Sequence, residues 1–272
     1  MRSRFSAAGP EGDSLLHDWR DGYTPAATRA GRVEVYGCRV DCVTLDEALD
    51  QVESWIESGD RGRIGLAVNA AKLENMRFEG SLRALAARAD LVIADGVGVL
   101  WAAAALGTPL PERVPGVDLC GRLLARAASR GWRPYLLGAS RSVVEELRAR
   151  VQATGVEVAG AHHGYWSGLD EARVAETIAA SGADMLFVAL GSPRQEAFLL
   201  RWSAELDVPY AMGVGGSFDV LAGRVERAPD AVGRVGLEWA WRVSRQPWRL
   251  ASRRTMTLAA FATRLIRTKI SG

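Results

Sequence analysis

Short apolar runs alternate with longer stretches of helical spacing through the middle of the chain. The apolar runs predict buried strands at 64–68, 91–94, 134–137, 156–159, 185–190 and 210–214. The stretches between them predict helices at 71–88, 98–106, 117–130, 143–153, 171–180 and 194–206. Strands that alternate with helices of this length form βαβ units, whose right-handed crossovers place helices on both faces of a sheet. The pattern therefore predicts an α/β fold with a doubly wound, mostly parallel sheet.

The two ends of the chain depart from this alternation. Residues 1–30 are rich in small and charged residues without periodicity, so we expect a disordered tail. A short hairpin is predicted at 33–43, and Thr44 with Glu47 forms a capping box for a helix at 45–58. After residue 222 the strands stop, and 238–244 and 250–270 have helical patterns. We expect an α/β domain at 31–222 and a separate helical appendage at 223–272.

Composition indicates a soluble globular protein. Of the 272 residues, 48% are hydrophobic and 24% are charged. No apolar run reaches the roughly 18 residues of a transmembrane helix, and no signal peptide is recognisable, so we expect a cytoplasmic protein. Cys38, Cys42 and Cys120 suggest buried thiols rather than a disulfide framework or zinc site. His162 and His163 could contact a ligand, although such a pair is more often structural.

The appendage is strongly basic. No Asp or Glu occurs after Arg242, and Trp241, Arg245, Trp248 and Arg249 recur near helical spacing. Such a segment suits an anionic partner, either a membrane surface or a nucleic acid. Because no nucleic-acid-binding motif is present, the anionic membrane surface is the favoured partner. The alternative is a basic amphipathic helix that packs on its own domain or on another subunit.

Polar residues and glycines follow several predicted strands, where ligands bind in open α/β sheets. Asn69 follows the first strand and Asp95-Gly96 the second. Asp95 could act as a general base, or it could simply cap the next helix. Arg113, a little further along the chain, could neutralise a phosphate.

Two later strand ends also carry candidate ligand groups. Gly191 to Glu196 combine a glycine turn with Arg194 at a helix start, which suits an anion, and Gln195 could hydrogen-bond a sugar. Glu196 is more simply interpreted as a first-turn acid that the helix dipole stabilises. The loop containing Gly213, Gly215, Gly216 and Asp219 could approach a diphosphate and a ribose. The chain has no phosphate-binding lysine loop and no Asp-x-Asp metal pair, so we expect no metal cofactor.

Taken in order, these motifs resemble the WecG/TagA/CpsF glycosyltransferases, glycosyltransferase family 26. The matching segments are 69–72, 95–99, 112–118, 136–138, 164–165, 188–196, 213–219, Gly223, 227–229 and 236–239. The resemblance covers about residues 35–254, and the ordered set is more specific than any single motif. One departure is Ala67, where many relatives have threonine.

The resemblance implies a Rossmann-like domain with a C-terminal membrane-docking appendage at the inner face of the cell membrane. It implies inverting transfer of a sugar, N-acetylmannosamine in the best-known members, from a UDP-sugar to a polyprenyl-diphosphate-linked saccharide. Uronic acid and glucose-type donors also occur in the family. It assigns the base to Asp95, and catalytic roles to Asn69, Arg113 and Gln195. Arg227 and Arg234 of the appendage could help Arg113 to stabilise the departing diphosphate.

Other interpretations remain open from the residues alone. A dinucleotide-dependent oxidoreductase would explain the sheet and the glycine loop, and a nucleic-acid-binding or scaffold protein would explain only the basic tail. A homo-oligomer could complete the site if one copy lends its appendage to the next.

Overall fold

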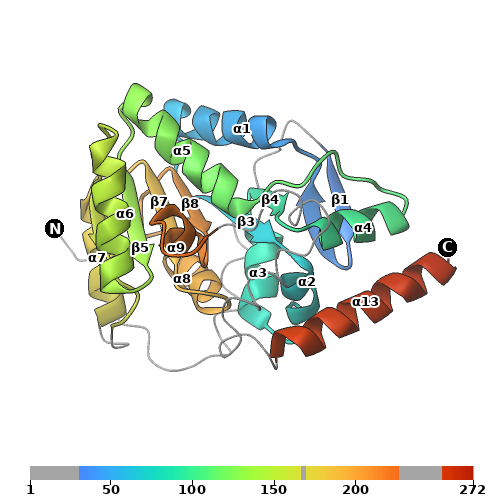
Figure 1. Cartoon of the computed structure of the whole chain (residues 1–272). Helices are drawn as coiled ribbons and strands as arrows, with labels where there is room; N and C mark the ends of the chain where they lie inside the picture. Colours follow the sequence, from blue (N-terminus) through green and yellow to red (C-terminus); the bar gives the residue numbers. More distant parts are fainter. Residues whose placement is uncertain (1–30, 167–169, 227–252, 272) are drawn as a thin grey trace.

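The computed structural model describes residues 31–166, 170–226 and 253–271, and its centre is an open parallel sheet (Figure 1). The 6-stranded sheet has the order β4-β3-β8-β7-β5-β6, with every neighbouring pair parallel. Its strands are β3 (Arg63–Val68), β4 (Leu91–Ala94), β5 (Pro134–Gly138), β6 (Gly160–His162), β7 (Met185–Ala189) and β8 (Tyr210–Gly213). The predicted parallel α/β fold is confirmed. The predicted tail at 1–30 and helix at 238–244 lie outside the described residues.

Helices cover both faces of the sheet, as the doubly wound pattern predicts. The core on one face packs α1 (Leu45–Ser58), α5 (Gly116–Arg130), α6 (Arg141–Ala153) and α9 (Ser217–Leu221). The core on the opposite face packs α2 (Ala70–Asn75), α3 (Gly80–Arg88), α4 (Val97–Ala105), α7 (Glu171–Ala180) and α8 (Arg194–Trp202). Except for the half-buried edge strand β6, the strands are buried along almost their whole length, as expected for a parallel sheet covered on two sides.

The predicted hairpin and the first capped helix are confirmed. Strands β1 (Arg32–Val35) and β2 (Cys38–Asp41) pair antiparallel. Asp41 anchors them to the main sheet, because its carboxylate pairs with Arg32 at 2.9 Å and accepts the Val92 N–H at 2.7 Å. Thr44 and Glu47 form both hydrogen bonds of the capping box that starts α1.

Three predicted elements differ from the structure. The strand predicted at 156–159 is wrong, because β6 comprises Gly160–His162. Val156 and Val158 are buried alternately, which mimics a strand, yet pairing with β5 begins at Gly160. That glycine leaves room for the Tyr135 ring, 2.4 Å from where its Cβ would lie.

The other two differences concern helix ends. The single helix predicted at 71–88 is divided into α2 and α3, and the second helix restarts at Gly80, a poor residue for a helix interior. The helix predicted at 194–206 ends at Trp202.

The C-terminal helix α13 (Arg253–Ser271) packs along α2 and α4. Its Phe261 is 4% exposed and fits beside Gly98, where a Cβ would lie 3.3 Å from the phenyl ring. Tyr36 of the hairpin meets Phe261 edge-on, and its hydroxyl lies 3.1 Å from Thr268 Oγ1. This basic helix therefore packs on its own domain, directly behind the turns that follow β3 and β4.

Candidate active site at the carboxyl edge of the sheet

The polar strand ends singled out in the sequence come from four neighbouring strands. Asp95 follows β4, Asn69 follows β3, the glycine loop follows β8, and Gly191 to Glu196 follow β7. In the sheet these strands have the order β4-β3-β8-β7. The chain leaves β3 and β7 toward one face and leaves β8 toward the other. Such a divergence is where open α/β sheets bind ligands.

Asp95 is half-buried and does not cap its own helix. The N-cap of α4 is Gly96, whereas Asp95 Oδ1 accepts the Gly116 N–H at 2.8 Å from the start of α5. Its second oxygen accepts no hydrogen bond from the described residues. That oxygen is free to accept a proton from a substrate.

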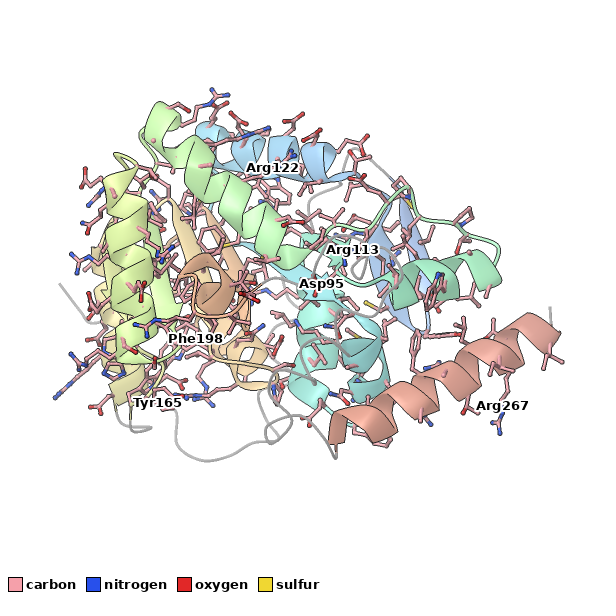
Figure 2. The ribbon with its side chains drawn as sticks, viewed as in Figure 1. Asp95, Arg113, Arg122, Tyr165, Phe198 and Arg267 are labelled. Carbon is pink, nitrogen blue, oxygen red and sulfur yellow. The ribbon has the colours of Figure 1, made fainter. Side chains whose placement is uncertain are left out.

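Arg113 is held close to Asp95 by the backbone. The Val114 N–H donates to Ala94 O at 2.9 Å. Arg113 precedes Val114 in the chain and Asp95 follows Ala94, so this bond brings the two residues close together. Both residues lie near the centre of the view in Figure 2. The bond therefore places Arg113 in the same loop region as Asp95.

Close packing around Asp95 explains why residue 116 is a glycine. A Cβ at Gly116 would lie 3.1 Å from the Ala67 Cβ and 3.9 Å from Asp95 Oδ1. Ala67 is 6% exposed, so its methyl group is packed against the start of α5.

Asn69 caps helix α2 and keeps hydrogen-bonding capacity to spare. Its Oδ1 accepts the Lys72 N–H at 3.0 Å, and its amide nitrogen has no partner among the described residues. Its Cβ lies 3.5 Å from the position of a Cβ at Gly96, which brings Asn69 against the turn that carries Asp95. Asn69 and Asp95 therefore form one local cluster.

Gln195 is placed beside the glycine loop and is only 1% exposed. Its Oε1 accepts the Gly215 N–H at 3.0 Å, and its Nε2 donates to Glu196 Oε1 at 3.0 Å. A Cβ at Gly213 would lie 2.5 Å from Nε2, so a larger residue there would force the Gln195 side chain or the loop to move. In this structure the amide supports the glycine loop from below.

Lys72 is a residue of the site to which sequence reasoning gave no role. Its Nζ pairs with Glu196 Oε1 at 2.9 Å, and the side chains are 12% and 0% exposed. Glu196 lies in the first turn of α8, as predicted, and is in addition a buried ion-pair partner of Lys72. The signal available in the sequence was a lysine three residues after the strand-end asparagine, which can reach back over the same turn.

The remaining predicted residues are distributed around this centre. Gly191 and Gly215 have positive φ angles of 78° and 53°, which favour glycine. Asp219 is half-buried in α9, at the far side of the glycine loop. Arg227 and Arg234 lie outside the described residues.

Arg194 points toward the neighbouring edge of the sheet. It donates to Gly164 O at 2.7 Å and lies 4.6 Å over the Trp166 ring. The His162 ring lies 5.6 Å from Trp166 and 4.7 Å from His163. Burial and neighbouring positive charge lower the pKa of His163 below its usual value. Arg194 and this aromatic group form a second cluster, beyond β7.

The described residues contain neither a grouped metal site nor a membrane-spanning helix. Among them, no three His, Cys, Asp or Glu side chains are grouped so that they could hold a metal ion. Within the same ranges, no helix combines the length and apolar character that spanning a membrane requires.

The fold and the site together define an open α/β protein with a carboxylate-centred site on adjacent strand ends. Residues 33–272 match the model of the glycosyl transferase WecG/TagA/CpsF family, and the chain belongs to this family. One relative is the N-acetylglucosaminyldiphosphoundecaprenol N-acetyl-beta-D-mannosaminyltransferase of Bacillus spizizenii. It is 38% identical over 197 residues, which cover 72% of this chain and 74% of the relative.

Proposed function

We propose that this glycosyltransferase moves an N-acetylmannosamine-type sugar from a UDP-sugar to a polyprenyl-diphosphate-linked saccharide, with inversion at the anomeric carbon. The acceptor named for the Bacillus spizizenii relative is a diphosphoundecaprenol-linked N-acetylglucosamine, which supports this acceptor class. The observation that carries the proposal is the carboxylate of Asp95, which lies in the same turn region as Asn69 and Arg113 and whose second oxygen accepts no hydrogen bond from the described residues.

In the proposed reaction Asp95 is the general base. An acceptor hydroxyl oxygen attacks the anomeric carbon while its proton passes to Asp95. The bond between that carbon and the β-phosphate oxygen of UDP breaks, and UDP leaves. The Gly116 N–H fixes Oδ1 of Asp95 and thereby orients the other oxygen. General-base assistance of this kind contributes roughly 10²–10⁴ in rate.

The donor diphosphate is the proposed ligand of the glycine loop. Gly213, Gly215 and Gly216 let the backbone approach closely, and Asp219 is suited to ribose hydroxyls. Arg113, with Arg227 or Arg234, would stabilise the leaving group in place of a metal. Gln195 contacts the loop through the Gly215 N–H and acts on the donor through it.

Because arginines take the place of a metal in this proposal, we expect that EDTA leaves turnover unchanged. A loss of turnover that Mg²⁺ restores would contradict this.

The lipid-linked acceptor requires that the protein reach a membrane surface. In α13, Ile266 and Ile270 are 59% and 79% exposed, while Phe261 is buried against the domain. Exposed apolar side chains on a helix that also carries the exposed Arg267 suit peripheral docking to anionic lipid. The double variant Ile266→Asp and Ile270→Asp should reduce sedimentation with anionic vesicles, and unchanged sedimentation would argue against this surface.

The deciding experiment measures UDP release from UDP-N-acetylmannosamine with a short-chain diphosphate-linked N-acetylglucosamine lipid. Acceptor-dependent release that Asp95→Asn reduces about 10²–10⁴-fold, with UDP binding kept, is the expected result. UDP binding without release would redirect the search to uronic or glucose-type donors. If the protein neither releases UDP nor binds it, the proposal is overturned. NAD(P) binding would then favour the oxidoreductase alternative.

A further inference from the structure

The ion pair between Lys72 and Glu196 joins the starts of two helices that follow non-adjacent strands of the sheet. Lys72 belongs to α2, which follows β3, and Glu196 belongs to α8, which follows β7. Between β3 and β7 lies β8, whose carboxyl end carries the glycine loop. The 2.9 Å contact between Nζ and Oε1 therefore spans the strand end that we assign to the donor.

Hydrogen bonds extend the pair in both directions. Lys72 Nζ also donates to Ala67 O at 2.9 Å, and the Lys72 N–H donates to Asn69 Oδ1. On the other side, Glu196 Oε1 accepts from Gln195 Nε2, and Gln195 Oε1 accepts from Gly215 N–H. We call Lys72, Glu196, Gln195 and Gly215 the loop tie. It is a continuous polar chain from the Asn69 turn to the glycine loop.

The charges fix the direction of every bond in the loop tie. An ionised carboxylate only accepts hydrogen bonds, so Glu196 must face the Nε2 side of the Gln195 amide. The carbonyl side of that amide is then left for the Gly215 N–H. The Glu196 carboxylate is 0% exposed and is paired with Lys72, and a buried carboxylate without such a partner is strongly disfavoured. Lys72 is thus linked to the Gly215 backbone through two intermediates, Glu196 and Gln195.

We propose that Lys72 and Glu196 are positioning residues, which hold the glycine loop at 213–216 in register with the Asn69 turn. The catalytic consequence rests on the proposed function, in which the glycine loop holds the donor and Asn69 lies beside the base. A misplacement of about 1 Å between such groups can cost on the order of 10²-fold in rate.

The first test needs no activity. Hydrogen–deuterium exchange of the full-length Lys72→Met variant is compared with wild type by mass spectrometry. The amides of 213–216 should exchange about tenfold faster, because the Gly215 N–H loses its fixed acceptor, while α1 is unchanged. Glu53→Gln is the matched control, because it weakens a mostly buried ion pair on the opposite face and should leave 213–216 as in wild type. Unchanged exchange of 213–216 in Lys72→Met would overturn the proposal.

The second test is a double-mutant cycle of Lys72→Met, Glu196→Gln and their combination. We expect UDP, measured by calorimetry, to bind each single variant about tenfold more weakly and kcat to fall 10–100-fold. The combined variant should recover about tenfold in kcat, because no buried charge is left and the amide oxygen at position 196 can still accept from Gln195 Nε2.

The outcomes separate this inference from the proposed function. Folded single variants with wild-type kcat and UDP affinity, or losses that simply add in the combination, would show a purely structural pair. A wild-type protein that releases no UDP would defeat the proposed reaction, while the exchange experiment would still decide whether the loop tie exists.

Discussion

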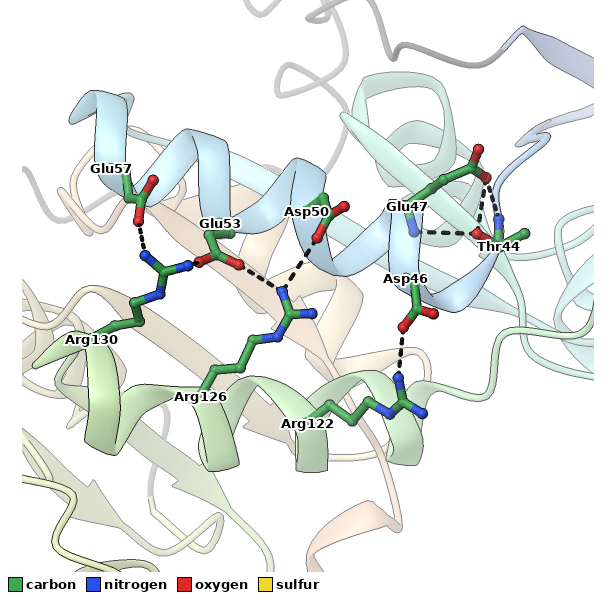
Figure 3. A network of polar contacts seen from close by, with 9 residues as sticks. All are labelled: Thr44, Asp46, Glu47, Asp50, Glu53, Glu57, Arg122, Arg126 and Arg130. Atoms are coloured by element: carbon green, nitrogen blue, oxygen red, sulfur yellow. Dashed lines mark hydrogen bonds and ion pairs between the residues drawn. The ribbon is translucent and has the colours of Figure 1, made fainter.

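Two groups of ion pairs on opposite faces of the sheet have the same chemistry and different surroundings. On one face, carboxylates of α1 meet arginines of α5 in what we call the α1–α5 ladder (Figure 3). Its pairs are Asp46–Arg122 at 2.6 Å, Asp50–Arg126 at 3.4 Å, Glu53–Arg126 at 2.6 Å, Glu57–Arg130 at 2.9 Å and Glu53–Arg130. On the other face, the loop tie contains one pair, Lys72–Glu196, with 12% and 0% exposure.

The two regions differ in how many partners each charged group has and in how exposed the ion pairs are to solvent. Arg126 and Arg130 each contact two carboxylates, and most ladder side chains are one-third to three-quarters exposed. Losing one partner there leaves another, and water screens the remainder. Each contact of the loop tie instead depends on the next. Changes to the ladder should therefore alter stability in small steps, whereas changes to the loop tie should alter the geometry of the site.

The largest effect is expected where the loop tie meets the glycine loop. Gly213→Ala would place a Cβ 2.5 Å from Gln195 Nε2 and 3.0 Å from its Cδ, which forces the amide or the loop to move. Turnover should fall by about 10² or more, measured as UDP release at saturating substrates. A variant that folds and retains more than half of the wild-type rate would contradict the role of Gln195 as a support.

Gly131→Ala is the matched control on the ladder side. Gly131 ends α5 with φ of 71° and has nothing within 4 Å of a Cβ, so the cost is backbone strain alone. The free energy of unfolding should fall by about 1–2 kcal/mol, with turnover unchanged.

A medium effect, on stability only, is expected for Glu53→Gln. The Glu53 side chain is 10% exposed and contacts both Arg126 and Arg130. Removing its charge should lower the free energy of unfolding by roughly 1–3 kcal/mol, as measured by urea denaturation. Because α1 and α5 lie on the face away from the loop tie, kcat and UDP affinity should stay within twofold. A larger change in kcat would mean that the two regions are coupled.

The fold and the residues at the strand ends could be predicted from the sequence, whereas the contacts between distant segments could not. Periodicity and capping identified the strands of the main sheet other than β6, and the start of α1, because those signals are local. The same is true of Asp95 and Asn69 as strand-end residues. The pairing of Lys72 with Glu196 could not be predicted, because it depends on β8 lying between β3 and β7. Glu196 lies in the first turn of α8 as predicted, but its burial and its pairing with Lys72 were not predicted, because burial is set by packing between distant segments.

The smallest effect is expected at the exposed end of the ladder. Asp46 and Arg122 are 75% and 56% exposed, so their pair is worth roughly 0.2–1 kcal/mol. Asp46→Asn should therefore lower the free energy of unfolding by less than about 1 kcal/mol in moderate salt. Asp46 also lies in the first turn of α1, where a negative charge is favoured by the helix dipole, and salt screens that term as well. The difference between variant and wild type should thus nearly vanish when the salt is raised to about 1 M, where the Debye length is about 3 Å. A difference that persists in high salt would mean that this pair is held more rigidly than its exposure implies, and that the contrast between the ladder and the loop tie is one of degree.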